Sequence, residues 1–143
     1  MSNLSLFLKE NKKQKKNTTY PATKSLCDEN GKVLEWVICP LSTKDNELIR
    51  DECIKNVPVR GKKGQYQKDL DTGKYLAKMI CACVVEPNLN NQQLQDSYGV
   101  KTPEELIREM IDDPGEYDEF AQFIQNYNGF DETLQDRKDE AKN

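Results

Sequence analysis

The amino-acid sequence predicts a mainly α-helical protein, a small helical bundle with an N-terminal two-stranded antiparallel β-hairpin. Three observations support this prediction. Apolar residues recur at helical spacing in three segments of the second half of the chain. Residues that cap helices stand directly before these segments. An Asn-Gly turn between two arms rich in Thr, Val and aromatic residues indicates one hairpin near the N-terminus.

Residues 18–39 are predicted to form the hairpin. Its arms, Thr18–Cys27 and Val33–Cys39, are joined by a turn that contains Asn30-Gly31. Alternation in the second arm places three apolar side chains on one face: Leu34, Trp36 and Ile38. A two-stranded hairpin is not stable alone in water, so this hairpin should lie on the helices.

The middle of the chain is predicted to hold one helix and then a loop. Ser42 or Thr43 is expected to cap a helix that extends to about Lys55, with Leu48 and Ile49 on its inner face and Cys53 one turn later. Residues 57–67 are predicted to be a loop because the segment contains one proline and two glycines.

Residues 69–86 show the strongest core pattern of the chain. Their apolar side chains follow the i, i+3, i+4, i+7, i+8 stripe of an amphipathic helix, and Pro87 should end this helix. A short polar helix follows, with Asn90 as its expected N-cap. Gly99 should take the left-handed conformation after it.

Two more helices are predicted before residue 130. Thr102 and Asp113 are each followed by a proline at the first helical position and by a glutamate at the third helical position. This combination is a strong signal for the start of a helix. The last helix should end at Tyr127, with Gly129 after it. These two helices present the apolar residues Leu106, Ile107, Met110, Ile111, Tyr117, Phe120, Ala121 and Ile124.

Composition predicts one globular domain with flexible ends. The hydrophobic fraction is 36% and the charged fraction is 32%, which indicates a modest core. We expect a flexible basic arm over residues 1–17 that could contain a short helix, a globular domain over residues 18–130, and a disordered charged tail over residues 131–143. The longest apolar run is too short to span a bilayer, and the N-terminus does not resemble a secretory signal. A cytoplasmic location without membrane contact is expected.

Charge is distributed unevenly along the chain. Residues 1–24 contain six lysines and one glutamate, residues 25–103 contain eleven charges of each sign, and residues 104–143 contain thirteen acids and four bases. A basic beginning and an acidic end could favour head-to-tail self-association or a basic partner. The simpler interpretation is that both ends are solvated segments.

The residue types argue against an enzyme. The sequence contains no histidine, which excludes Ser-His-Asp and Cys-His nucleophilic pairs and histidine-dependent zinc sites. The five cysteines include no Cys-x-x-Cys pair, and Cys81 and Cys83 would point to nearly opposite sides of a helix. The paired carboxylates are explained by helix N-termini; Asp69 and Asp71, for example, are expected in the first turn of a helix. We predict no catalytic residue, no metal and no cofactor.

Two basic runs could bind phosphate groups. Lys12-Lys13-Gln14-Lys15-Lys16 has no interleaved aromatic residue, and Arg60-Gly61-Lys62-Lys63-Gly64 lacks the spacing of a phosphate-binding loop. The sequence pI is about 5.0. A solvated linker and an ordinary loop are the favoured interpretations, and nucleic-acid binding is not expected.

Three residues are candidates for a partner-binding groove. Tyr98 lies at the edge of the short polar helix that also contains Leu94, and Phe123 falls off the apolar stripe of the last helix. Large side chains that a core does not explain are common in interfaces. We therefore expect Leu94, Tyr98 and Phe123 to bind an apolar helix of a partner.

Several blocks of the sequence occur in a characteristic order. They are Leu4-x-x-Phe7-Leu8, the strand around Trp36, Pro58-Val-Arg-Gly-Lys-Lys-Gly-Gln-Tyr66, Cys81-x-Cys-Val-Val-Glu-Pro87-Asn-Leu89, Leu94-Gln-Asp-Ser-Tyr-Gly99, Pro114-Gly-Glu-Tyr117 and Asn128-Gly-Phe130. This combination, which covers about residues 4–131, resembles the XkdN-like phage tail assembly chaperones. The resemblance transfers no catalytic set.

The resemblance implies a non-enzymatic role in phage tail assembly. Such a chaperone would hold the tape measure protein soluble until tail tube subunits polymerise around it, and it would be absent from the finished virion. Related short chaperones are often accompanied by a longer form made by ribosomal frameshifting, which could contact the tail tube protein. The alternative is a structural tail completion or connector protein retained in the virion. A small regulatory nucleic-acid binder is a third interpretation, for which salt-sensitive binding would be required.

Overall fold

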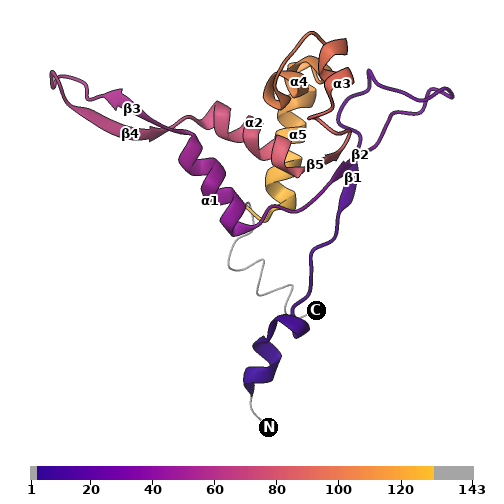
Figure 1. Ribbon diagram of the computed structural model, residues 1–143, viewed down its shortest axis with the longest axis horizontal. Helices are drawn as coiled ribbons and strands as arrows, with labels where there is room; N and C mark the ends of the chain where they lie inside the picture. The colour runs from indigo at the N-terminus through magenta and orange to yellow at the C-terminus, as the bar shows by residue number, and fades with distance from the viewer. Residues whose placement is uncertain (1–2, 131–143) are drawn as a thin grey trace.

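The computed structural model describes residues 3–130 and shows a mixed α+β domain (Figure 1). The predicted helical bundle is confirmed only in part, because the described helices are accompanied by two antiparallel sheets. The α-helices are α1 (Thr43–Glu52), α2 (Thr72–Cys83), α3 (Gln92–Ser97), α4 (Pro103–Met110) and α5 (Pro114–Tyr127). The strands are β1 (Thr18–Tyr20), β2 (Trp36–Ile38), β3 (Ile54–Pro58), β4 (Tyr66–Leu70) and β5 (Val84–Glu86).

The three-stranded sheet joins distant parts of the chain. β2 is its central strand and pairs antiparallel with β1 on one side and with β5 on the other. The expected antiparallel pairing of the two N-terminal arms is confirmed, with Tyr20 opposite Trp36. The paired segments are shorter than the predicted arms. Beyond them, the arms meet again at the isolated bridge between Cys27 and Val33.

The third strand corrects the helix predicted over residues 69–86. That helix ends at Cys83, and the next three residues form β5. Two β-branched residues, Val84 and Val85, favour an extended backbone, and the backbone of β2 offers hydrogen-bonding groups on this side. Val84 pairs with Ile38, and the Cys39 N–H donates to the Cys83 carbonyl at 2.8 Å.

The predicted starts of the last two helices are confirmed. The side chains of Thr102 and Asp113 accept the backbone N–H groups of Glu105 and Glu116, and each helix has a proline in its first turn. These bonds satisfy N–H groups that have no partner within a helix. Helix α5 ends at Tyr127 as expected.

The short helix α3 begins one residue later than predicted. Asn91, not Asn90, is the N-cap, because its side-chain oxygen accepts the Leu94 N–H at 2.9 Å. Gly99 has φ of +69° and follows the helix as expected. The Val100 N–H then donates to the Gln95 carbonyl at 3.0 Å, which closes the end of the helix.

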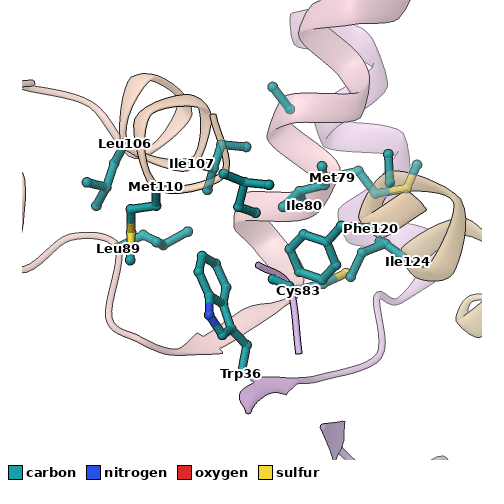
Figure 2. Packing of buried hydrophobic residues seen from close by; sticks show 14 of the residues in the cluster. Trp36, Met79, Ile80, Cys83, Leu89, Leu106, Ile107, Met110, Phe120 and Ile124 are labelled. Carbon is teal, nitrogen blue, oxygen red and sulfur yellow. The ribbon is translucent and has the colours of Figure 1, made fainter. Parts of the chain in front are cut away.

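The core lies between the three-stranded sheet and helices α2, α4 and α5. Figure 2 shows Trp36 of β2 between Leu89 and Met110 on one side and Phe120 on the other. Trp36 is 2% exposed and its ring meets that of Phe120 edge to face, with centroids 5.7 Å apart. The residues of the core cluster are Ala22, Trp36, Ile38, Ala77, Met79, Ile80, Cys83, Leu89, Val100, Leu106, Ile107, Met110, Ile111, Phe120, Ala121 and Ile124.

A second hairpin, formed by β3 and β4, projects from the body (Figure 1). It corrects the loop predicted over residues 57–67. Its ten strand residues are paired in register from Ile54 opposite Leu70 to Pro58 opposite Tyr66. The same region corrects two further expectations: Leu48 faces solvent at 56% exposure, and Asp69 lies in β4 rather than in a helix. Asp71 is the N-cap of α2.

The N-terminal arm extends away from the domain (Figure 1). It contains two short 3₁₀ turns, Asn3–Phe7 and Lys9–Asn11. The arm is attached near the end of α5, where the Tyr127 hydroxyl donates to the Lys16 carbonyl and the Lys15 ammonium lies 4.5 Å from the Tyr127 ring centroid. The predicted tail over residues 131–143 lies outside the described residues.

Candidate functional site

An apolar groove lies where β2, α3 and the end of α4 meet. We call it the α3 groove. Its lining residues are Leu26, Leu34, Glu35, Trp36, Glu86, Pro87, Leu94, Tyr98 and Met110. Leu34 is 43% exposed, whereas Trp36 is buried. The groove therefore has a rigid aromatic floor and walls whose apolar side chains remain accessible.

The walls are fixed by local hydrogen bonds that the sequence encodes. The buried Gln95 side chain donates to the Leu89 carbonyl at 2.8 Å and so attaches α3 to the segment that follows β5. The cap at Asn91 and the left-handed Gly99 hold both ends of this one short helix. Six residues could not form a stable helix alone. These bonds set the position from which Leu94 and Tyr98 reach the groove.

A second, shallower depression continues the α3 groove. Its lining residues are Val85, Glu86, Pro87, Asn88, Asn91 and Leu94. The two depressions share Glu86, Pro87 and Leu94, so they form one continuous surface along α3. Val85 adds an exposed apolar side chain at 49% exposure. An elongated apolar surface of this kind suits an elongated partner, such as a helix or a strand.

The structure brings together two of the three predicted site residues. Leu94 and Tyr98 line the α3 groove, and Phe123 does not. The Phe123 ring stacks between Tyr20 and Tyr127, with centroid distances of 4.2 Å and 6.0 Å. Sequence periodicity placed Phe123 off the core stripe of α5 correctly, but the side of the helix that it occupies is covered by β1.

Five apolar lining residues of the groove were not among the predicted site residues: Leu26, Leu34, Trp36, Pro87 and Met110. A signal existed for Leu34, since alternation placed it on the same face as Trp36. No local signal existed for Met110, which the helical stripe assigned to the core and which is both 5% exposed and part of the groove. A residue at the edge of a core and a residue inside it have the same periodicity.

The ionisable groups of the domain have structural roles. The Glu116 carboxylate accepts the Lys24 N–H at 2.8 Å and the Thr23 hydroxyl at 2.7 Å, and these bonds hold the pKa of Glu116 below its usual value. Lys78 pairs with Glu52 at 3.3 Å and Glu104 at 3.4 Å, linking α1, α2 and α4.

Two cysteine thiols, those of Cys81 and Cys83, are chemically unreactive near neutral pH. Burial raises the pKa of the Cys81 thiol to about 12 and that of the Cys83 thiol to about 11, so little thiolate forms near neutrality. Over residues 3–130, no group of three or more Cys, Asp or Glu side chains is arranged to hold a metal ion. In the same range, no helix combines the length and apolar character that crossing a membrane requires.

Comparisons with known proteins confirm the resemblance to the XkdN-like family. A family model described as phage XkdN-like tail assembly chaperone protein matches residues 4–142. The phage-like element PBSX protein XkdN of Bacillus subtilis (strain 168) is 27% identical over 142 residues, which cover 98% of this chain and 93% of that protein. The protein YqbN of the same strain is also 27% identical, with the same coverage.

The fold has a counterpart among solved structures. The crystal structure of the protein YqbN matches with a TM-score of 0.74 and 20% sequence identity, and the match covers 92% of this chain and 99% of that chain. At this level of identity the likeness establishes a shared fold. The combination of helices and short strands seen here is therefore the architecture of an experimentally determined relative.

Proposed function

The chain belongs to the XkdN-like phage tail assembly chaperones, a non-catalytic family, and from this premise we propose that its client is the tape measure protein. The α3 groove is the observation that carries the proposal. It joins accessible apolar side chains of neighbouring elements, among them Leu34 at 43% exposure and Val85 at 49% exposure, in one continuous surface. Apolar surface that remains open after folding marks a site of interaction.

The chemistry of the groove fits a helix with an apolar stripe. A tape measure protein is long and mostly helical, and before tail assembly its stripes would face water and promote aggregation. The side chains of Leu34, Leu94 and Tyr98 can cover such a stripe, because an amphipathic helix places an anchor every three or four residues along one face. The chaperone would thus replace water at the stripe.

Two carboxylates give the groove a preference among apolar helices. Glu35 and Glu86 both lie in its lining, and no basic residue does. A client helix with Lys or Arg beside its apolar stripe would bring opposite charges together, which raises the association rate and fixes the orientation. We propose that the client segments have this composition.

Many copies would act on one client. A single groove of this size would bind weakly, whereas successive copies along one long helix benefit from a high effective concentration. On this proposal the protein works in the host cytoplasm and leaves the client as tail tube subunits arrive, so it is absent from the finished virion. A longer frameshifted form would provide the contact with the tail tube protein.

Co-expression with the tape measure protein of the same phage tests the proposal. The wild-type chain should keep the client in the soluble fraction and co-purify with it. The double variant Leu94→Ala, Tyr98→Ala removes two partly exposed apolar side chains and should weaken binding about 10- to 100-fold, if each side chain contributes roughly 0.7–1.4 kcal/mol. The control Leu48→Ala, Phe130→Ala removes two large apolar side chains from exposed positions outside the groove, at 56% and 48% exposure.

Two outcomes would contradict the proposal. Client binding that is equally strong in the groove variant and in the control, with both variants folded, would place the site elsewhere. Stable retention of the chain in purified virions would favour the structural tail completion or connector role instead.

A further inference from the structure

The projecting hairpin of β3 and β4 has no explanation within the domain. We call residues 54–70 the β3–β4 arm. All but three of its residues are exposed, on both faces of the ribbon, and the other three are only partly buried. Among the helices and strands of residues 3–130, β3 and β4 contact mainly each other. Isolated two-stranded hairpins are marginal in water, so an arm of this kind gains stability when another surface covers it.

The arm is strongly basic. It contains five basic residues and one acidic residue, which gives a net charge of +4. Arg60, Lys62 and Lys63 lie together at the exposed tip, where Gly61 and Gly64 both have positive φ and allow the tight turn. In the part of the chain that the structure describes, no ion pair involves the arm.

The same chain carries a complementary surface on α4 and α5. We call residues 104–119 the acidic face. This segment contains eight acidic residues and one basic residue, for a net charge of −7. Glu104 and Glu116 are engaged in the bonds described above. Six acidic residues remain exposed: Glu105, Glu109, Asp112, Asp113, Asp118 and Glu119.

The arm and the acidic face lie on different sides of the molecule. In Figure 1 the arm projects to the left beyond α1 and α2, whereas α4 lies at the upper right. The arm therefore does not fold back onto the acidic face of its own chain. A contact between two different patches of identical molecules is heterologous, and such contacts build open rows when they do not close into a ring.

We propose that the β3–β4 arm of one copy docks against the acidic face of a second copy. The two surfaces carry opposite net charge, and both are exposed in the single molecule. This inference goes beyond the proposed client binding, because it uses neither the α3 groove nor the client. Rows of copies in head-to-tail contact would match a client that is long and repetitive along its axis.

The expected contact is weak and sensitive to salt. Each exposed ion pair stabilises a contact only slightly, and salt of about 0.15 M screens charges beyond about 8 Å. A contact of this strength assembles little in dilute solution. It becomes effective when neighbouring copies are already held on one client, since their effective concentration is then high. Rows would therefore form on the client and come apart without it.

Charge reversal separates this contact from other kinds of association. The arm variant Arg60→Glu, Lys62→Glu, Lys63→Glu changes the arm from +4 to −2, which leaves both surfaces acidic. The face variant Glu109→Lys, Asp112→Lys, Asp118→Lys, Glu119→Lys changes the acidic face from −7 to +1, which leaves both surfaces basic. Neither variant should self-associate. An equimolar mixture should associate, because each variant offers the surface that the other lacks. The matched control Lys9→Glu, Lys12→Glu, Lys13→Glu makes the same change in net charge on the N-terminal arm.

Self-association of the full chain can be measured by analytical ultracentrifugation and by NMR dilution series. The protein concentration should reach about 1 mM, in about 20 mM salt. The wild type and the control should self-associate, with shifts in residues 54–70 and 104–119, and about 0.5 M salt should weaken association at least about tenfold. Each reversed variant should lose association about tenfold or more, and their mixture should regain it.

Three results would overturn the inference. The wild type could remain monomeric throughout the series, the mixture could fail to associate, or the control could lose association as fully as the arm variant. A salt-sensitive affinity for a DNA or RNA oligonucleotide that the arm variant alone abolishes, without any self-association, would assign the arm to nucleic acid instead. Since no client is present, the result does not depend on whether the client proposal is correct.

Discussion

Replacing Phe123 tests whether this residue is part of the fold or part of the partner surface. Its ring stacks on Tyr20 of β1 at 4.2 Å with an interplanar angle of 19°, and on Tyr127 at 6.0 Å with an angle of 8°. Tyr127 in turn contacts the N-terminal arm through Lys15 and Lys16. Phe123→Ala would therefore remove the ring that connects Tyr20 to Tyr127, while Tyr20 keeps its stacking contact with Phe120.

The cost follows from two contributions. Aromatic pairs contribute about 0.5–1.5 kcal/mol each beyond area burial, and truncating a half-buried phenylalanine loses about half of the 1.5–3 kcal/mol of full burial. We expect Phe123→Ala to lower the free energy of unfolding by roughly 2–3 kcal/mol, which corresponds to a Tm lower by about 4–12 °C. Phe123→Leu keeps most of the apolar volume and should cost about 1 kcal/mol.

Urea and thermal unfolding followed by circular dichroism measure both variants. Tyr98→Ala, measured in parallel, should have a much smaller effect because this side chain lies at the accessible wall of the α3 groove. If Phe123→Ala unfolds like the wild type and Tyr98→Ala does not, the assignment of the two residues to fold and groove is reversed. Client binding per folded molecule should survive the Phe123 substitution.

Three further outcomes are expected. Glu116→Gln should lower the free energy of unfolding at neutral pH. The pKa of Glu116 is lower in the folded state than in the unfolded state, so the carboxylate stabilises the fold above its unfolded-state pKa and loses this effect as the pH falls through its folded-state pKa. The stabilities of wild type and variant should therefore converge when unfolding is measured at increasingly acidic pH. Iodoacetamide near pH 8 should modify exposed Cys27 well before Cys81 and Cys83, as read by mass spectrometry. Gly99→Ala should cost roughly 1–2 kcal/mol in urea unfolding, because φ of +69° is strained for an L side chain even though the space is open.

The sequence was most informative where local rules act alone. The caps at Thr102 and Asp113 and the left-handed Gly99 depend on neighbours within a few residues, and all three are found as predicted. The core stripe of α2 was also predictable, because amphipathic spacing follows from helix geometry. Helices α2, α4 and α5 form the core against which Trp36 of the α3 groove packs. Two other lining residues of the groove, Leu94 and Tyr98, were among the predicted site residues.

The missed elements depend on pairing partners. Val84 and Val85 continue an apolar helical run, and only the presence of β2 alongside decides that they form a strand. The β3–β4 arm has solvent on both faces, so it lacks the alternation that identifies a strand with one buried face. Leu48 satisfies a helical pattern but faces solvent, since α1 has no buried residue.

The bond between Thr23 and Glu116 has a consequence for synthesis on the ribosome. It joins side chains 93 positions apart, and Trp36 likewise packs against Phe120 of the last described helix. While α4 and α5 are still being translated, the N-terminal strands have no surface to pack on, and contacts of such large sequence separation form late. A newly made chain should therefore acquire its groove only after α5 has left the exit tunnel. Incomplete chains would therefore not compete with finished copies for the client.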